Sequence, residues 1–154
     1  MTTEEHIAAA REIVDSNQYA VLGTADADGR PWATPVYFAH VGYREFIWVS
    51  LPGTRHSTNI RLRSTIGMVI FDSRSFIGAG TGVYVDAEAA EVTADLGRYT
   101  EVFSARSLAH GGSEWTVDDV TGWSGLRLYR AVAVELSLLV RDGEYEARVP
   151  VDLR

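Results

Sequence analysis

Ten residues, 54–63, carry the side chains of this sequence that are best suited to hold an anion. They read Thr-Arg-His-Ser-Thr-Asn-Ile-Arg-Leu-Arg and lie between two apolar segments. A short helix that begins at Thr54 would point free backbone N–H groups, and the positive end of its dipole, at a bound ligand. Arg55, His56 and Ser57 would add side-chain donors at the same end. The segment therefore predicts a site for the phosphate group of a ligand.

The elements that must position this segment are mostly strands. From residue 19 onward apolar residues alternate with a period of two, and turn residues interrupt the alternation at short intervals. The expected strands are residues 19–25, 32–40, 44–50, 66–72, 81–93, 125–140 and 144–149. Because strands follow one another through short turns, the pattern predicts a mainly β protein, a small antiparallel barrel with two or three peripheral helices. We expect a single domain over residues 1–154, with the barrel over about 19–149.

Two helices longer than the 54–63 segment are expected outside the barrel. Residues 3–16 have the spacing of an amphipathic helix, and Thr2 with Glu5 forms a capping box at its start. Residues 96–109 have the same kind of spacing, and Asp95 is expected to cap them. Both helices should pack an apolar face on the sheet.

The composition excludes several classes of function. The 154 residues include no cysteine, so disulfides, thiolate nucleophiles and cysteine-ligated metals are excluded. All 14 basic residues are arginine, which excludes Schiff-base and Walker A lysines. The net charge of −7 argues against a general nucleic-acid surface. No apolar run approaches the roughly 20 residues that span a bilayer, and the N-terminus lacks the features of a secretory signal, so we expect a cytoplasmic protein.

Metal and acid–base chemistry have weak signals in this sequence. The four histidines are far apart and show no metal-ligand spacing, so no metal site is expected. No side chain stands out as a general acid or base. Tyr37 and His40 are catalytic candidates only if they face a cleft, and no catalytic residue is assigned.

The order of the motifs resembles that of a known family. Residues 22–38 read Leu-Gly-Thr-Ala-Asp-Ala-Asp-Gly-Arg-Pro-Trp-Ala-Thr-Pro-Val-Tyr-Phe, a strand, a turn and a strand. A strand that carries Trp48, the polar segment 54–63, an apolar strand and then Gly-Thr-Gly-Val-Tyr at residues 80–84 follow. Over roughly residues 5–140 this succession resembles the pyridoxamine 5′-phosphate oxidase-like, FMN-binding split-barrel family. The resemblance implies a split barrel and a homodimer with two flavin sites at the subunit interface.

The resemblance also implies which residues hold the cofactor. The implied phosphate ligands, with Ser50 near the ribityl chain, are Ser50, Arg55, His56, Ser57 and Asn59. The backbone of one strand would face the edge of the isoalloxazine ring, at Pro35, Val36 and Tyr37. Family members often carry a lysine in the phosphate segment, and His56 is in its place here. Trp123, in a loop, would cover a ring or lie in the dimer interface, and Arg127 would either reach the neighbouring subunit's ligand or form a surface ion pair.

The expected activity is flavin-dependent hydride transfer to or from a small molecule, with FMN as cofactor. The deazaflavin F420, whose acidic tail would suit Arg55, Arg61 and Arg63, is the alternative cofactor. A non-catalytic flavin- or haem-binding protein is the alternative of another class, and a haem ligand would then be histidine, tyrosine or methionine. The true pyridoxamine phosphate oxidases end in an arginine- and tryptophan-rich tail that residues 148–154 do not resemble. Vitamin B6 oxidation is therefore not expected.

Overall fold

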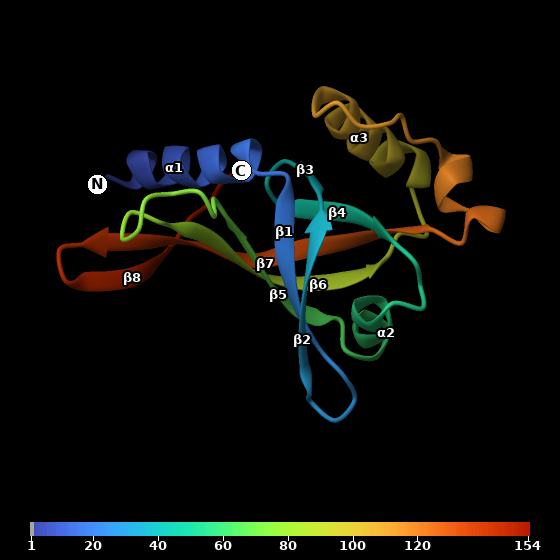
Figure 1. Ribbon diagram of the computed structural model, residues 1–154, viewed down its shortest axis with the longest axis horizontal. Coiled ribbons are helices and arrows are strands. Elements are labelled where there is room, and N and C mark those ends of the chain that lie inside the picture. Colours follow the sequence, from blue (N-terminus) through green and yellow to red (C-terminus); the bar gives the residue numbers. More distant parts are fainter. Residues whose placement is uncertain (1) are drawn as a thin grey trace.

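The computed structural model describes residues 2–154, whose strands form one antiparallel sheet that curls into an open split barrel (Figure 1). The strand order is β2-β1-β5-β6-β7-β4-β3, and β8 pairs with the later part of β7. The strands are β1 (Tyr19–Ala25), β2 (Pro31–Tyr37), β3 (Ala39–Val41), β4 (Glu45–Ser50), β5 (Thr65–Phe71), β6 (Gly82–Glu91), β7 (Arg127–Asp142) and β8 (Tyr145–Pro150). The expected mainly β architecture is confirmed.

Phe38 connects β2, at one edge of the sheet, to β3, at the other edge. The predicted single strand over residues 32–40 is wrong, because β2 ends at Tyr37 and β3 begins at Ala39. Phe38 is fully buried, and its N–H donates to the Gln18 carbonyl oxygen at 3.2 Å. Since β2 and β3 lie at opposite ends of the strand order, the sheet must curl to bring these two edges within one residue of each other.

Three α-helices flank the sheet. They are α1 (Thr3–Ser16), α2 (Arg55–Leu62) and α3 (Leu96–Ala109), and two short 3-10 helices follow, η1 (Val117–Val120) and η2 (Gly122–Ser124). The capping box of Thr2 and Glu5 at the start of α1 is confirmed. The predicted side-chain cap at Asp95 is wrong. Asp95 has a left-handed φ of 54° and makes no capping hydrogen bond, whereas a capping side chain needs an extended backbone to reach the first turn.

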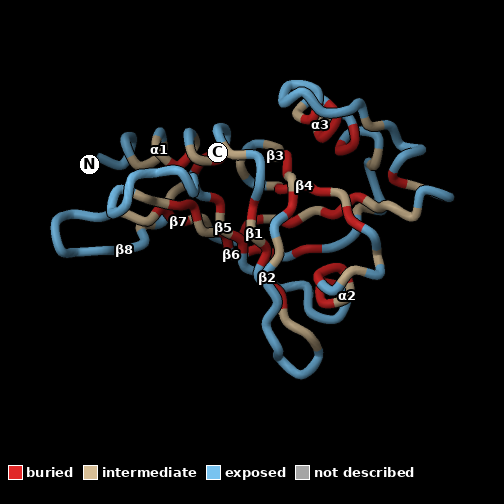
Figure 2. The backbone as a smooth tube through the Cα atoms, in the orientation of Figure 1, coloured by how far each residue is buried: buried red, intermediate tan, exposed pale blue. Residues whose placement is uncertain are grey.

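The main core lies inside the curled sheet and is formed mainly by buried residues of β1, β4, β5, β6 and β7 (Figure 2). Val83, Val85 and Ala87 of β6 are buried, as their alternation predicts. Trp48 of β4 stacks on Tyr129 of β7 with 6.0 Å between ring centroids. A second apolar cluster lies between β4 and α3. Strand β4 is therefore packed on both faces, which makes it a rigid support for the residues near its end.

No helix within residues 2–154 is both long and apolar enough to cross a membrane.

Candidate functional site

Polar side chains converge where β4 ends and α2 begins. Ser50 Oγ lies 2.8 Å from His56 Nε2, and Thr54 Oγ1 lies 3.4 Å from the same nitrogen. Thr54 Oγ1 also lies 2.8 Å from Ser57 Oγ and accepts the Ser57 backbone N–H at 3.3 Å, so Thr54 caps α2. The N–H groups of Arg55 and His56 precede the first helical hydrogen bond and are free to bind an anion. We call these five residues the α2 cluster.

The α2 cluster is largely buried and its histidine is neutral at neutral pH. Ser50, His56 and Ser57 are each no more than 9% exposed. Burial lowers the pKa of the His56 imidazole below its ordinary value. A neutral imidazole can donate to or accept from Ser50, whereas its protonation would place a cation at the positive end of α2. The site therefore offers neutral donors, namely the Ser57 hydroxyl and whichever member of the Ser50–His56 pair accepts in the bond between them.

The exposed cation of the cluster is Arg55, which lies over the ring of Trp32. Its guanidinium carbon is 4.3 Å from the ring centroid, a cation–π contact between α2 and β2. Trp32 is 39% exposed, so one side of this pair faces solvent. The contact holds the guanidinium beside the first turn of α2, where it can meet a phosphate oxygen.

A cavity of about 490 Å³ opens on another side of α2. Ser57 and Arg61 line it from the helix, and Glu91 and Tyr129 line it from β6 and β7. The buried hydroxyl of Ser57 thus lies next to space that can take part of a small ligand.

Asn59 is directed away from the cluster, although the family resemblance implied that it is one of the phosphate ligands. It is 3% exposed, and its Nδ2 donates to Thr24 Oγ1 of β1 at 3.0 Å. This buried bond joins α2 to the barrel. Thr24 was missed by the sequence analysis, since a polar residue at a strand end gives no signal of its partner.

The segment Pro35–Val36–Tyr37 lies on β2, which is an edge of the sheet. Only β1 pairs with β2, so the other side of the β2 backbone has no strand partner within the described residues. The side chain of Val36 enters the core, that of Pro35 is exposed, and Tyr37 packs under α3. A free strand edge is what backbone contacts with a planar ring require.

Arg127 begins β7, the strand that pairs with β4 at Ser50. Trp123 lies on η2, just before β7. In the β4–β7 register Arg127 is opposite Ser50, and its Nε is 3.9 Å from Glu91 Oε1. Its Nη1 donates to the Leu126 carbonyl oxygen at 2.7 Å. Trp123 is fully exposed on η2. Its predicted role in covering a ring therefore needs a partner from outside this chain and stays a prediction.

Tyr37 and His40, which were catalytic candidates only if they face a cleft, lie in different surroundings. His40 faces α1, where its Nε2 is 3.0 Å from Asp15 Oδ1, and lines none of the cavities described here. Tyr37 lines a separate cavity beneath α3. Among residues 2–154 no group of three or more histidine, aspartate or glutamate side chains is arranged to hold a metal ion.

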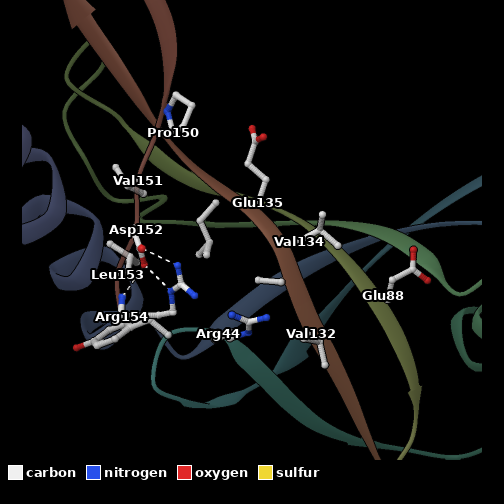
Figure 3. A pocket seen from close by; sticks show the side chains of 13 residues that line it. Arg44, Glu88, Val132, Val134, Glu135, Pro150, Val151, Asp152, Leu153 and Arg154 are labelled. Carbon is white, nitrogen blue, oxygen red and sulfur yellow. Dashed lines mark hydrogen bonds and ion pairs between the residues drawn. The ribbon is translucent and has the colours of Figure 1, made fainter.

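Another cavity lies apart from the α2 cluster. It is a groove of about 720 Å³ beside β7 and the C-terminal segment (Figure 3). Asp152 and Arg154 pair across 2.7 Å at one end of it, while Glu88 and Glu135 project separately. The groove shares no lining residue with the cavity beside α2.

Comparison with known proteins gives one family and several structural relatives. The family model of pyridoxamine 5′-phosphate oxidase matches residues 7–132. No curated protein matches the chain in sequence.

Solved structures of similar fold include two haem proteins and a protein related to a general stress protein. HutZ, the haem storage protein from Vibrio cholerae, has a TM-score of 0.68 and 20% identity, over 91% of this chain and 95% of that one. A haem-binding protein from Mycobacterium smegmatis has a TM-score of 0.67 and 18% identity, over 97% of this chain and 58% of that one. A Clostridium acetobutylicum protein related to general stress protein 26, of the pyridoxinephosphate oxidase family, has a TM-score of 0.66 and 14% identity, over 96% of each chain. These likenesses show the fold.

Proposed function

The chain belongs to the pyridoxamine 5′-phosphate oxidase family, and on this basis we propose that it is a flavin-dependent oxidoreductase that holds FMN by its phosphate at the α2 cluster. One observation carries the proposal, namely the convergence of Ser50, Thr54, Arg55, His56 and Ser57 at the N-terminus of α2. Two free backbone N–H groups, neutral donors and one guanidinium suit a phosphate dianion.

The protein's part in this chemistry is to position the ring. Bound FMN would supply the hydride-transfer chemistry, and the residues around it would set its orientation and exclude water. The phosphate would be held by the α2 cluster, and the free edge of β2 from Pro35 to Tyr37 would supply backbone donors and acceptors to the ring. Trp123 and Arg127 would complete the site in a homodimer. We assign no catalytic residue.

F420 is the alternative cofactor within the same proposal. Its acidic tail would need several free guanidinium groups, and Arg63 already donates to the Ala27 carbonyl oxygen at 3.0 Å. Arg55 and Arg61 remain exposed. Only Arg55 lies at the start of α2, so one guanidinium faces that end of the helix, which suits the terminal phosphate of FMN better than a tail with several carboxylates.

A haem-binding role is the second candidate. The names of two structural relatives support it, HutZ from Vibrio cholerae and the Mycobacterium smegmatis protein. In this chain the exposed imidazole of His110, at the edge of an aromatic cavity, is the side chain best placed to act as an axial ligand.

The test is a titration of the purified apo-protein with FMN, F420 and haemin in separate experiments, followed by absorbance and fluorescence. We expect FMN to bind, and the double variant Arg55→Ala/Ser57→Ala to weaken binding by about 1–3 kcal/mol for each charge-assisted bond that is lost. Arg74→Ala is the matched control. The side chain of Arg74 is 92% exposed, and this substitution removes one arginine charge outside the α2 cluster.

The outcomes separate the candidates. FMN affinity that is unchanged in the double variant would rule out the phosphate assignment. Haemin binding with a Soret band that His110→Ala abolishes, together with no flavin binding, would replace the oxidoreductase by the haem candidate.

A further inference from the structure

A cavity of about 440 Å³ lies beneath α3, on the face of β4 opposite the α2 cluster. Tyr37 of β2 and Val49 of β4 line its base, and Phe103 of α3 covers it. His110 and Trp115, in the segment that follows α3, line its side. The volume lies within the range of sites for small molecules. No residue of the α2 cluster lines this cavity, so the proposed phosphate site does not account for it.

The rings around this cavity meet edge to face. Tyr37 and Phe103 have their centroids 5.6 Å apart at an interplanar angle of 82°, and Tyr37 and His110 are 5.8 Å apart at 88°. Trp115 meets Phe103 at 5.5 Å and 79°. Such T-shaped contacts fix the orientation of the rings without stacking them on one another. Each such contact uses the edge of one ring and one face of the other, so the second face of a ring stays available to a planar molecule where that face borders the cavity.

The Tyr37–His110 pair is the polar contact between the aromatic rings of the lining, which also includes the polar residues Gln18, Ser107 and Ser113. The Ser107 hydroxyl already donates to the Ser113 carbonyl oxygen at 2.7 Å. The Tyr37 hydroxyl oxygen and His110 Nδ1 lie 2.6 Å apart. Burial raises the pKa of the Tyr37 phenol, and burial together with the Arg106 charge lowers the pKa of His110. Both groups are thus neutral at neutral pH. Depending on the imidazole tautomer, the pair leaves a donor or an acceptor free for one polar atom of a ligand.

The cavity offers no partner for a charged group. Within the described chain its lining residues include no aspartate, glutamate or arginine. Arg106 of α3 lies close to Tyr37, but its Nη2 donates to the carbonyl oxygens of Val14 and Asn17 at 3.0 and 2.8 Å, which joins α3 to the end of α1. A charged ligand would lose hydration here without gaining an ion pair.

We propose that the cavity beneath α3 binds a small, uncharged, planar aromatic molecule that carries one hydrogen-bonding atom, which the Tyr37–His110 pair recognises. The aromatic rings select a flat apolar body, and the neutral pair selects one hydroxyl, carbonyl or ring nitrogen on it. Its identification as the substrate of the enzyme rests on the proposed function, whereas the binding itself does not.

Quinoline and naphthalene are the probes, because they have the same shape and differ in one ring nitrogen. Each is titrated into the full chain without added cofactor, and backbone and Trp115 indole NMR signals are followed. We expect both probes to shift the signals of Tyr37, His110 and Trp115. The 4-carboxylate of quinoline, which adds a charge, should shift none of them.

Variants locate the polar contact. Tyr37→Phe keeps the ring and removes the hydroxyl, so the affinity for quinoline should fall about three- to tenfold while that for naphthalene changes by less than about twofold. Tyr145→Phe is the matched control, because Tyr145 is 83% exposed on β8. Trp115→Ala provides a second variant, which should weaken both probes because it removes one aromatic ring of the lining.

Absence of any shift at these three residues up to the solubility of quinoline would overturn the proposal. An equal loss for both probes in Tyr37→Phe would overturn the role of the pair. Because these titrations use no flavin, their failure leaves the phosphate proposal intact, and failure of FMN to bind leaves this cavity's proposal intact.

Discussion

His40 joins α1 to the barrel through both of its ring nitrogens. Its Nε2 lies 3.0 Å from Asp15 Oδ1, and its Nδ1 accepts the backbone N–H of Tyr43 at 3.2 Å. Because Nδ1 is an acceptor, the neutral ring carries its hydrogen on Nε2, and a second proton can enter only by breaking the bond to Tyr43. Burial lowers the pKa of His40, although the hydrogen bond that its Nε2 donates to Asp15 opposes the shift.

The lowered pKa values of His40 and His56 predict that the protein loses stability on mild acidification. As pH falls through the ordinary histidine value, the unfolded chain takes up protons that the folded protein does not, so the free energy of unfolding decreases. Urea unfolding at about pH 7.5 and about pH 5.5 should show a lower midpoint at the lower pH. His40→Gln should reduce this difference, and a midpoint that stays constant or rises on acidification would contradict the assignment.

At the residue scale, the sequence could predict contacts between neighbours in the chain but not contacts between distant residues. Arg55, His56 and Ser57 fall at the start of one helix, so their convergence followed from local spacing. Tyr37 and His110 are 73 positions apart, and neither has a neighbour that indicates the other. Their meeting depends on where α3 packs, which only the folded sheet decides.

At the element scale, periodicity predicted most strands and helices within a few residues. It was wrong where tertiary contacts override the local pattern. Phe38 continues the apolar run of β2, yet it enters the core and divides the predicted strand. Asp95 has the composition of a helix cap, but its left-handed backbone removes the side chain from that role. Both errors arise from backbone geometry that residue type alone does not specify.

The C-terminal segment and α1 stabilise one another through Leu153. This side chain is 1% exposed and belongs to the core cluster that includes Ala10 and Val14 of α1. Arg11 Nη2 donates to the Leu153 carbonyl oxygen at 2.7 Å, so the segment is also fixed by its backbone. Residues 150–154 thereby form one side of the groove in Figure 3.

Leu153→Ala should therefore lower the free energy of unfolding by about 2–5 kcal/mol, through lost burial and the cavity that remains. Chemical unfolding monitored by circular dichroism measures the change. Leu108→Ala is the matched control, because Leu108 lies on α3 with 53% exposure, and it should cost far less. Equal effects of the two variants would mean that the C-terminal segment does not contribute to the core.

At the scale of the whole molecule, the pairing of distant strands is what the sequence could not supply. Hairpins such as β1–β2 follow from turn residues, but the pairing of β1 with β5 and of β4 with β7 joins strands separated by a helix or more. The family resemblance supplied that arrangement. The composition of each strand indicated only that it would be buried on one or both faces.

The surface also leaves Trp123 fully exposed on η2, beside the strand that carries Arg127. When a second copy of the chain covers an exposed tryptophan, a large apolar area is removed from water, which stabilises the dimer. We therefore expect a homodimer, with twice the 16.9 kDa mass of the chain in light scattering. Trp123→Ser should shift the population toward monomer and weaken FMN binding together, because the proposed site is completed across the interface. Val117→Ser, at another exposed apolar position, is the control. A dimer that Trp123→Ser leaves intact, with unchanged FMN affinity, would place the interface on another face of the sheet.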